Sequence, residues 1–185
     1  MHSRLIYLMG PSGSGKDSLL SYVRHHLTGD DTAVVAHRYI TRDAGSSGEN
    51  HVALSEREFD HRVKAGLFAM HWSSHGLRYG VGIEINHWLA LGLTVVVNGS
   101  RTYFPNVGYR YPEVYPVRVD VKPEVLRSRL LQRGREESAA IEARLSRADM
   151  TDSHFLSGAV IDNNGQLERA GNEFLHLIRS LRVAA

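Results

Sequence analysis

The chain has 185 residues, of which 42% are hydrophobic and 23% are charged, with 22 basic and 20 acidic side chains and no cysteine. This length suits one domain with a sizeable core, and the composition argues against a disordered tail or a membrane protein. The lack of cysteine excludes a disulfide scaffold, a zinc-thiolate site and a thiol nucleophile.

The first nine residues contain a short apolar stretch that runs into Gly10-Pro11 without a small-residue cleavage site. This pattern makes a poor signal peptide, so we expect a soluble, cytoplasmic protein. Residues 5–9 form the first predicted strand. A glycine-rich turn follows, and then a helix from about Lys16 to Leu27 with apolar side chains at helical spacing.

Strand-like and helical patterns then alternate. Ser55 and Glu58 form a capping box that starts a helix, and Gly66 stops it. The apolar run at 93–97 is typical of a central parallel strand that is buried on both faces. Further strands are predicted at 33–36, 114–121 and 159–161, loops at 42–50 and 101–112, and helices at 123–132 and 167–181. The alternation indicates an α/β fold with a mainly parallel sheet, in a single domain spanning 1–185.

The glycine-rich turn lies between a predicted strand and a predicted helix, which is the context of a phosphate-binding loop. Its residues are Gly10, Pro11, Ser12, Gly13, Ser14, Gly15 and Lys16. Glycines allow backbone N–H groups to surround phosphate oxygens, and a lysine at this position can reach the β and γ phosphates.

The loop departs from the usual pattern at Asp17, where a serine or threonine normally contacts Mg²⁺. Asp17 could hold the metal directly or through water, or Ser18 and the substrate phosphates could take over this role. As a first-turn acid, Asp17 could equally serve only to stabilise the helix dipole.

With this loop, Thr41-Arg42, Tyr79-Gly80 and a polar arm at about 133–147, the chain resembles the guanylate kinase superfamily over nearly its whole length. The loop together with residues 39–42 is most similar to the kinases of ribose 1,5-bisphosphate that act in bacterial phosphonate degradation. The resemblance implies a P-loop fold with helices flanking the central sheet, an acceptor-binding segment at about 38–82 and a mobile lid at about 133–147. It also implies transfer of phosphate from ATP, with Mg²⁺, to ribose 1,5-bisphosphate, giving phosphoribosyl diphosphate.

The resemblance also implies site residues. Those expected to act in catalysis are Lys16, Arg133 and Arg144. Those expected to bind the donor are the loop residues 10–16 with Asp17, Ser18 and Arg135, Asp17 being the candidate Mg²⁺ ligand. Those expected to bind the acceptor are Arg38, Thr41, Arg42, Glu49, Tyr79 and Asn98.

Two departures from guanylate kinases bear on the acceptor. Alignment on Phe68 and Tyr79-Gly80 puts Met70 where a glutamate reads guanine, and Val81 where a hydroxyl residue does so. Apolar side chains cannot accept the N–H groups of guanine, so we expect a phosphorylated acceptor without guanine. The alternatives are a nucleoside monophosphate kinase of altered specificity and a non-catalytic guanylate-kinase-like interaction module.

The expected partners are small molecules, a sugar phosphate and ATP, and neither nucleic acid nor a membrane. The segment 101–112 mixes aromatic and basic residues, but no larger basic field surrounds it. We interpret it as a sheet-edge or subunit-contact loop, and a homodimer is compatible with the sequence.

Overall fold

A computed structural model of the chain describes residues 4–44, 49–133 and 158–181. Its central sheet is parallel throughout and confirms the predicted α/β class. In spatial order the strands are β2 (Ala33–Val35), β7 (Thr94–Asn98), β1 (Leu5–Met9), β8 (Tyr115–Asp120) and β9 (Ala159–Asp162). These are the strands that the sequence predicted, with bounds that differ by one or two residues.

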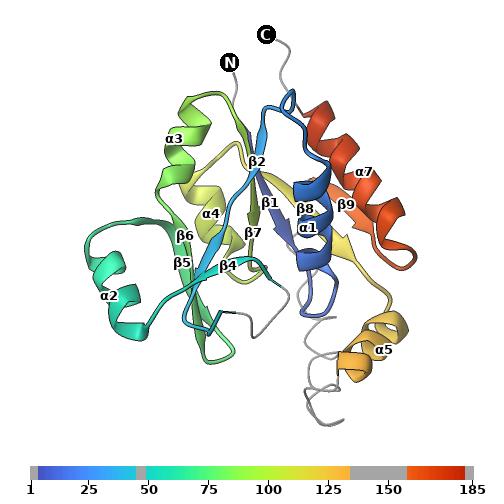
Figure 1. The fold of residues 1–185 in the computed structure, drawn as a ribbon, viewed down its shortest axis with the longest axis horizontal. Coiled ribbons are helices and arrows are strands. Elements are labelled where there is room, and N and C mark those ends of the chain that lie inside the picture. The colour runs from blue at the N-terminus through green and yellow to red at the C-terminus, as the bar shows by residue number, and fades with distance from the viewer. Residues whose placement is uncertain (1–3, 45–48, 134–157, 182–185) are drawn as a thin grey trace.

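The central strand β1 is buried on both faces because its side chains alternate between two hydrophobic clusters. Ile6 and Leu8 pack with α1 (Lys16–His26) and α7 (Leu167–Ser180). On the opposite face, Leu5, Tyr7 and Met9 join the cluster that includes buried residues of α3 (Glu84–Ala90) and α4 (Phe104–Arg110). The sheet is therefore a middle layer with helices on both sides (Figure 1).

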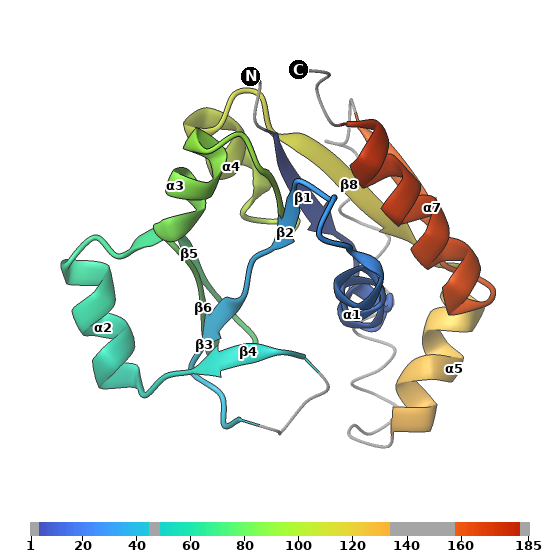
Figure 2. The ribbon, with the colours of Figure 1, turned by 45° about the horizontal axis from the view of Figure 1, so that its top comes forward.

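A second, smaller sheet lies beside the first and was not predicted from sequence. Its order is β4 (His51–Ala53), β3 (Arg38–Ile40), β6 (Leu77–Gly82) and β5 (Phe68–Ser74). Strands β5 and β6 form an antiparallel pair, and β3 pairs antiparallel with β6 and parallel with β4. The chain passes directly from β2 into β3, which places this sheet across from α1 (Figure 2).

Helix α2 (Glu56–Lys64) covers part of the second sheet and begins as predicted. The Ser55 hydroxyl accepts a hydrogen bond of 3.1 Å from the Glu58 backbone N–H, which caps the helix. Phe59 is buried against Phe68, with ring centroids 4.7 Å apart. The helix α5 (Pro123–Arg133) follows β8, as the sequence predicted.

The prediction of a loop at 101–112 is wrong, because α4 occupies most of this segment. A proline in the first turn favours the helix start, and Val107 is buried in the cluster beneath the sheet. Phe104 packs on Tyr7 with a centroid distance of 5.6 Å. Tertiary packing of the aromatic residues thus stabilises a helix whose apolar periodicity is too short to recognise.

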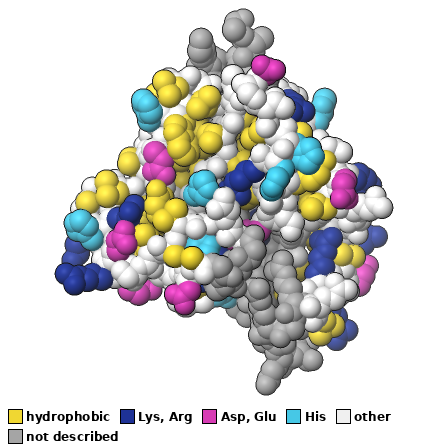
Figure 3. Space-filling model, viewed as in Figure 1, with side chains coloured by type: hydrophobic (Ala, Val, Ile, Leu, Met, Phe, Trp, Pro, Cys, Tyr) yellow, Lys and Arg dark blue, Asp and Glu magenta, His cyan; other side chains and the backbone are white. Residues whose placement is uncertain are grey.

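None of the described helices is long and apolar enough to cross a membrane. On the face drawn in Figure 3, described Lys and Arg side chains are interspersed with acidic ones and form no single basic field.

Candidate active site

The glycine-rich turn after β1 adopts the conformation expected of a phosphate-binding loop. Gly13 and Gly15 have φ angles of 90° and 88°, in the left-handed region that other residues rarely adopt. Gly15 is the N-cap of α1, so the unpaired N–H groups of the first helical turn open toward the loop. A helix start of this kind attracts phosphate through its N–H groups and its dipole.

Lys16 is held inside the loop by two backbone carbonyls. Its Nζ donates to the oxygens of Gly10 and Pro11, over 2.8 and 3.0 Å. Burial lowers the pKa of Lys16 to about 8, and the nearby Asp17 carboxylate only partly opposes this effect. A desolvated ammonium group in this position is strongly attracted to an anionic ligand.

The turn between β9 and α7 contacts the phosphate loop and supports it. The side-chain amide of Asn163 donates to the backbone oxygen of Ser14 over 2.7 Å, and Asn163 is 3% exposed. A β-carbon on Gly15 would lie 2.4 Å from this amide nitrogen, so the turn requires glycine there for space as well as for conformation. The contact of Asn163 with the loop depends on the strand order of the central sheet, which no local sequence pattern shows.

Asp17 lies at the start of α1 beside the end of β7. Its Oδ1 accepts a hydrogen bond of 2.8 Å from the Asn98 side chain. Asn98 is 2% exposed, and its own Oδ1 has no hydrogen-bond partner among the described residues. Tyr7 fixes the adjoining turn, because its hydroxyl accepts from the Ser100 N–H and donates to the Ser100 carbonyl. Two predicted site residues, Asp17 and Asn98, are thus in direct contact.

The strand β3 and the segment after it present two arginines that share one carboxylate. Glu49 accepts from Arg38 Nε over 2.5 Å and from Arg42 Nη2 over 2.9 Å. The Glu49 side chain is 7% exposed. Burial alone would raise the pKa of Glu49, but the hydrogen bonds from Arg38 and Arg42 outweigh it and hold the pKa below the usual value. Glu49 therefore fixes the two guanidinium groups in one orientation.

Other contacts fix the same segment. The two ring nitrogens of His51 lie 3.0 and 3.2 Å from the carbonyl oxygens of Glu49 and Arg42. Thr41 accepts a hydrogen bond from the Arg78 N–H through its hydroxyl, over 2.9 Å. These contacts connect Glu49 and Arg42 to strand β4 and Thr41 to strand β6.

Tyr79 on β6 also lies at this group. The Arg38 guanidinium carbon is 5.0 Å from the centroid of the Tyr79 ring, and the ring also stacks on Trp72. Arg38 Nη2 is also 3.9 Å from Asp17 Oδ1. Arg38 therefore links the phosphate loop to the second sheet.

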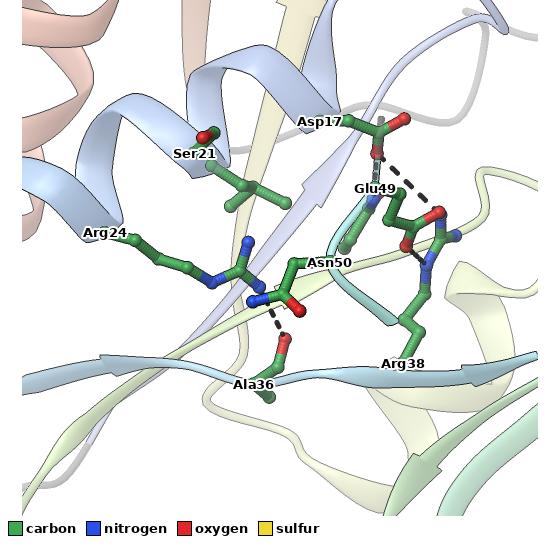
Figure 4. Close-up of a pocket in the computed structure, with 9 residues that line it drawn as sticks. Asp17, Ser21, Arg24, Ala36, Arg38, Glu49 and Asn50 are labelled. Carbon is green, nitrogen blue, oxygen red and sulfur yellow. Dashed lines mark hydrogen bonds and ion pairs between the residues drawn. The ribbon is translucent and has the colours of Figure 1, made fainter. Parts of the chain in front are cut away.

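A pocket opens between α1 and the second sheet (Figure 4). Its lining includes three of the predicted residues in addition to Asp17, and five residues that sequence reasoning missed. The lining residues are Asp17, Leu20, Ser21, Arg24, Ala36, Arg38, Glu49, Asn50 and Asn98. Arg24 could have been found from its spacing, because it lies two helical turns after Asp17 on α1.

Three predicted arginines fall outside what the structure describes. Arg135 and Arg144 lie outside the described residues, and Arg133 ends α5 without a described side chain. Their roles stay predictions. Among the described residues, no group of three or more His, Asp or Glu side chains could form a metal site.

The two positions at which guanylate kinases read guanine are buried in this protein. Met70 and Val81 are direct partners across β5 and β6, and they are 1% and 0% exposed. Both belong to the hydrophobic cluster beneath the central sheet. Neither side chain can hydrogen-bond a base, which agrees with the expectation from sequence.

A phosphate loop that faces arginines on and next to a second, mixed sheet defines the fold of a P-loop kinase of the guanylate kinase type. The fold agrees, because the crystal structure of guanylate kinase from Anaplasma phagocytophilum superposes with a TM-score of 0.70 at 18% identity, covering 99% of this chain and 88% of that one. Ribose 1,5-bisphosphate phosphokinase PhnN from Thiobacillus denitrificans is 53% identical over 175 residues, 95% of this chain and 92% of its own length. The protein of the same name from Desulfomicrobium baculatum is 51% identical over 182 residues, 98% of this chain and 97% of its own. The chain belongs to the ribose 1,5-bisphosphate phosphokinase family. No protein-family model matches it.

Proposed function

We propose that the protein transfers the γ-phosphoryl group of ATP to ribose 1,5-bisphosphate, forming phosphoribosyl diphosphate and ADP. The observation that carries this proposal is identity of about half the residues, over nearly the whole chain, to ribose 1,5-bisphosphate phosphokinases. The pocket between α1 and the second sheet supports it, because Arg24 and Arg38 line it and an anionic acceptor needs positive charge there. The same resemblance associates the reaction with phosphonate degradation.

The phosphate loop is the proposed donor site. Its N–H groups and Lys16 would bind the β and γ phosphates of ATP. Two carbonyls orient the Lys16 ammonium, and the Ser14 hydroxyl is buried without a hydrogen-bond partner among the described residues. A bound phosphate would supply the counter-charge that Lys16 lacks.

Asp17 suits a Mg²⁺ ion as a ligand. One carboxylate oxygen is held by Asn98, and the side chain is 39% exposed, so the carboxylate can reach a ligand from the solvent side. Carboxylate oxygen is a hard ligand of the kind that Mg²⁺ prefers, and phosphate oxygens and water complete such sites. When bound, the ion would neutralise charge on the transferred phosphoryl group.

The acceptor phosphate is proposed to bind Arg38, Arg42 and Tyr79. Arginine pairs with phosphate through two parallel N–H bonds, and Glu49 already orients both guanidinium groups. An oxygen of the acceptor's 1-phosphate then bonds to the γ phosphorus while the bond to the β–γ bridging oxygen breaks, and ADP leaves. Because this phosphate is already largely deprotonated at neutral pH, the chain needs no general base.

Separate incubations with Mg-ATP and each acceptor test the proposal. We expect ADP release with ribose 1,5-bisphosphate and a diphosphate signal in the phosphorus NMR spectrum of the product. GMP should give much slower release, since Met70 and Val81 offer no group to read guanine. ADP release with GMP but not with ribose 1,5-bisphosphate would overturn the proposal in favour of a nucleotide kinase.

A further inference from the structure

Arg24 is a pocket residue without an acidic partner in the part of the chain that the structure describes. Its side chain extends from α1, forms part of the pocket wall and is partly buried. One guanidinium nitrogen donates to the Ala36 carbonyl over 3.3 Å, and its Nε is buried with no hydrogen-bond partner among the described residues. No described carboxylate forms an ion pair with it. Burying an arginine without a counter-ion is costly, so such a group marks a place where an anion binds.

The electrostatics of Arg24 point the same way. Burial lowers the pKa of Arg24, and the carboxylates of Glu49 and Asp17 only partly offset this effect at a distance. Glu49 is already committed to Arg38 and Arg42. The free protein therefore holds Arg24 in a poorly compensated state, which a bound dianion would relieve.

Arg24 and Arg38 mark two separate ends of the pocket. Arg38 lies beside Asp17, at the end next to the phosphate loop. Arg24 lies two turns further along α1, about 10 Å along the helix axis. Figure 4 shows the two guanidinium groups on opposite walls with Asn50 between them. Two cationic groups on opposite walls of one pocket suit a small ligand with an anion at each end.

We propose that Arg24 binds the 5-phosphate of ribose 1,5-bisphosphate and thereby selects a bisphosphorylated acceptor. This inference rests on the proposed function and deepens it. Arg38 and Arg42 hold the reacting 1-phosphate beside the loop, and Arg24 holds the distal phosphate at the other end. The sugar ring would lie between the two arginines, next to Asn50.

Calorimetric titration without ATP separates the two phosphates. The ligands are ribose 1,5-bisphosphate, ribose 1-phosphate, which lacks the distal phosphate, and ribose 5-phosphate, which lacks the reacting one. In Arg24→Gln we expect Kd for the bisphosphate to rise about 10- to 100-fold, the range for losing charged hydrogen bonds. Kd for ribose 5-phosphate should rise as well, whereas Kd for ribose 1-phosphate should change less than about twofold.

Kinetics give an independent readout. KM for ribose 1,5-bisphosphate should rise in Arg24→Gln, while KM for ATP stays unchanged because the loop is untouched. Arg57→Gln, the same change on the exposed face of α2, is the matched control and should alter neither value. If Arg24→Gln fails to fold by circular dichroism, Arg24→Lys keeps the charge but loses the paired N–H geometry, and should show the same selectivity with a smaller effect.

Three results would overturn the inference. Equal weakening of ribose 1-phosphate and the bisphosphate would assign Arg24 to the reacting phosphate, and no change in either would remove it from the site. Wild-type protein that binds ribose 1-phosphate as tightly as the bisphosphate would show that no distal phosphate site exists. Tight, Arg24-dependent binding of the bisphosphate without ADP release would instead overturn the proposed reaction and leave the anion site standing.

Discussion

The phosphate loop and the acceptor side of the pocket position charge in opposite ways. The loop relies on consecutive residues, whose backbone groups hold the single ammonium of Lys16. The acceptor side relies on side chains that are distant in sequence, with Glu49 joining Arg38 to Arg42 and Tyr79 lying against Arg38. In the proposed function, donor recognition would be a local property of the backbone, while acceptor recognition would depend on a network of side chains.

This difference explains why arginine and lysine are used in different places. The loop needs one compact charge on a flexible stem, which lysine provides. The acceptor side needs planar groups that a carboxylate can orient and a phosphate can pair with, which arginine provides. Loss of a loop residue should therefore be severe, and loss of one network member should be graded.

The largest expected effect is in the loop. Lys16→Ala removes the ammonium that would contact the β and γ phosphates, so kcat/KM for the bisphosphate reaction should fall at least about 100-fold. Steady-state assays and circular dichroism should report an inactive but folded protein. Lys64→Ala, on the exposed face of α2, is the control. Full activity in Lys16→Ala would show that the loop is not the donor site.

The pH dependence of ATP binding tests the same group without mutation. In the free protein Lys16 loses its proton with a pKa of about 8, and ATP requires the protonated form. Affinity should therefore be steady below pH 8 and fall above it, by up to about tenfold per pH unit. Titrations between pH 7 and 9.5 measure this slope, which should vanish in Lys16→Ala. A slope that persists in the variant would show that another group titrates.

On the acceptor side, Glu49→Gln should have a moderate and selective effect. The amide cannot hold both guanidinium groups as the buried carboxylate does, so KM for ribose 1,5-bisphosphate should rise about 10-fold while KM for ATP stays constant. The free energy of unfolding should fall by about 1–3 kcal/mol in urea titrations. Glu58→Gln breaks an exposed pair with Arg62 and should cost less than about 0.5 kcal/mol. A rise in KM for ATP larger than the rise in KM for ribose 1,5-bisphosphate would contradict the division between the two regions.

The smallest expected effect is at Asp17, where the two regions meet. Asp17→Ser restores the usual loop residue but removes the carboxylate that Asn98 contacts. The Mg²⁺ concentration for half-maximal activity should shift a few-fold, because ligand charge changes at the metal. An unchanged Mg²⁺ titration would leave Asp17 as a helix-dipole residue only.

Sequence reasoning predicted the central layer well because its signals are local. The apolar run predicted at 93–97 is visible in a short window and occurs as β7, shifted by one residue. Outside the central layer, the Ser55 cap of α2 is an equally local signal and is present. Strand β3 of the second sheet escaped because it has three residues and pairs with a partner far along the chain, such as Arg38 with Val81. Strands β5 and β6 form a local hairpin that the sequence analysis missed. Helix α4 escaped for a related reason, since its seven residues are stabilised by packing on Tyr7.

The candidate site divides in the same way. Residues 10–16 were sufficient to predict a phosphate loop, because spacing and glycine conformation carry that function. The resemblance also pointed to Arg38, Arg42 and Tyr79, but nothing local predicts that Glu49 joins the two arginines. For Arg24, the only signal in the sequence was its helical spacing from Asp17. That it has no carboxylate partner among the described residues becomes visible only in the assembled pocket.

The sequence by itself determined the parallel α/β layer and the phosphate loop, because each depends on residue type and short-range spacing, while the resemblance to guanylate kinases implied the lack of guanine-reading groups. The tertiary structure decided which charges meet. It paired Asp17 with Asn98, gave Arg38 and Arg42 a shared carboxylate, and left Arg24 without one among the described residues. Buried charges interact with groups that are close in space but far apart in the sequence, so their partners are fixed only when the strands are in register.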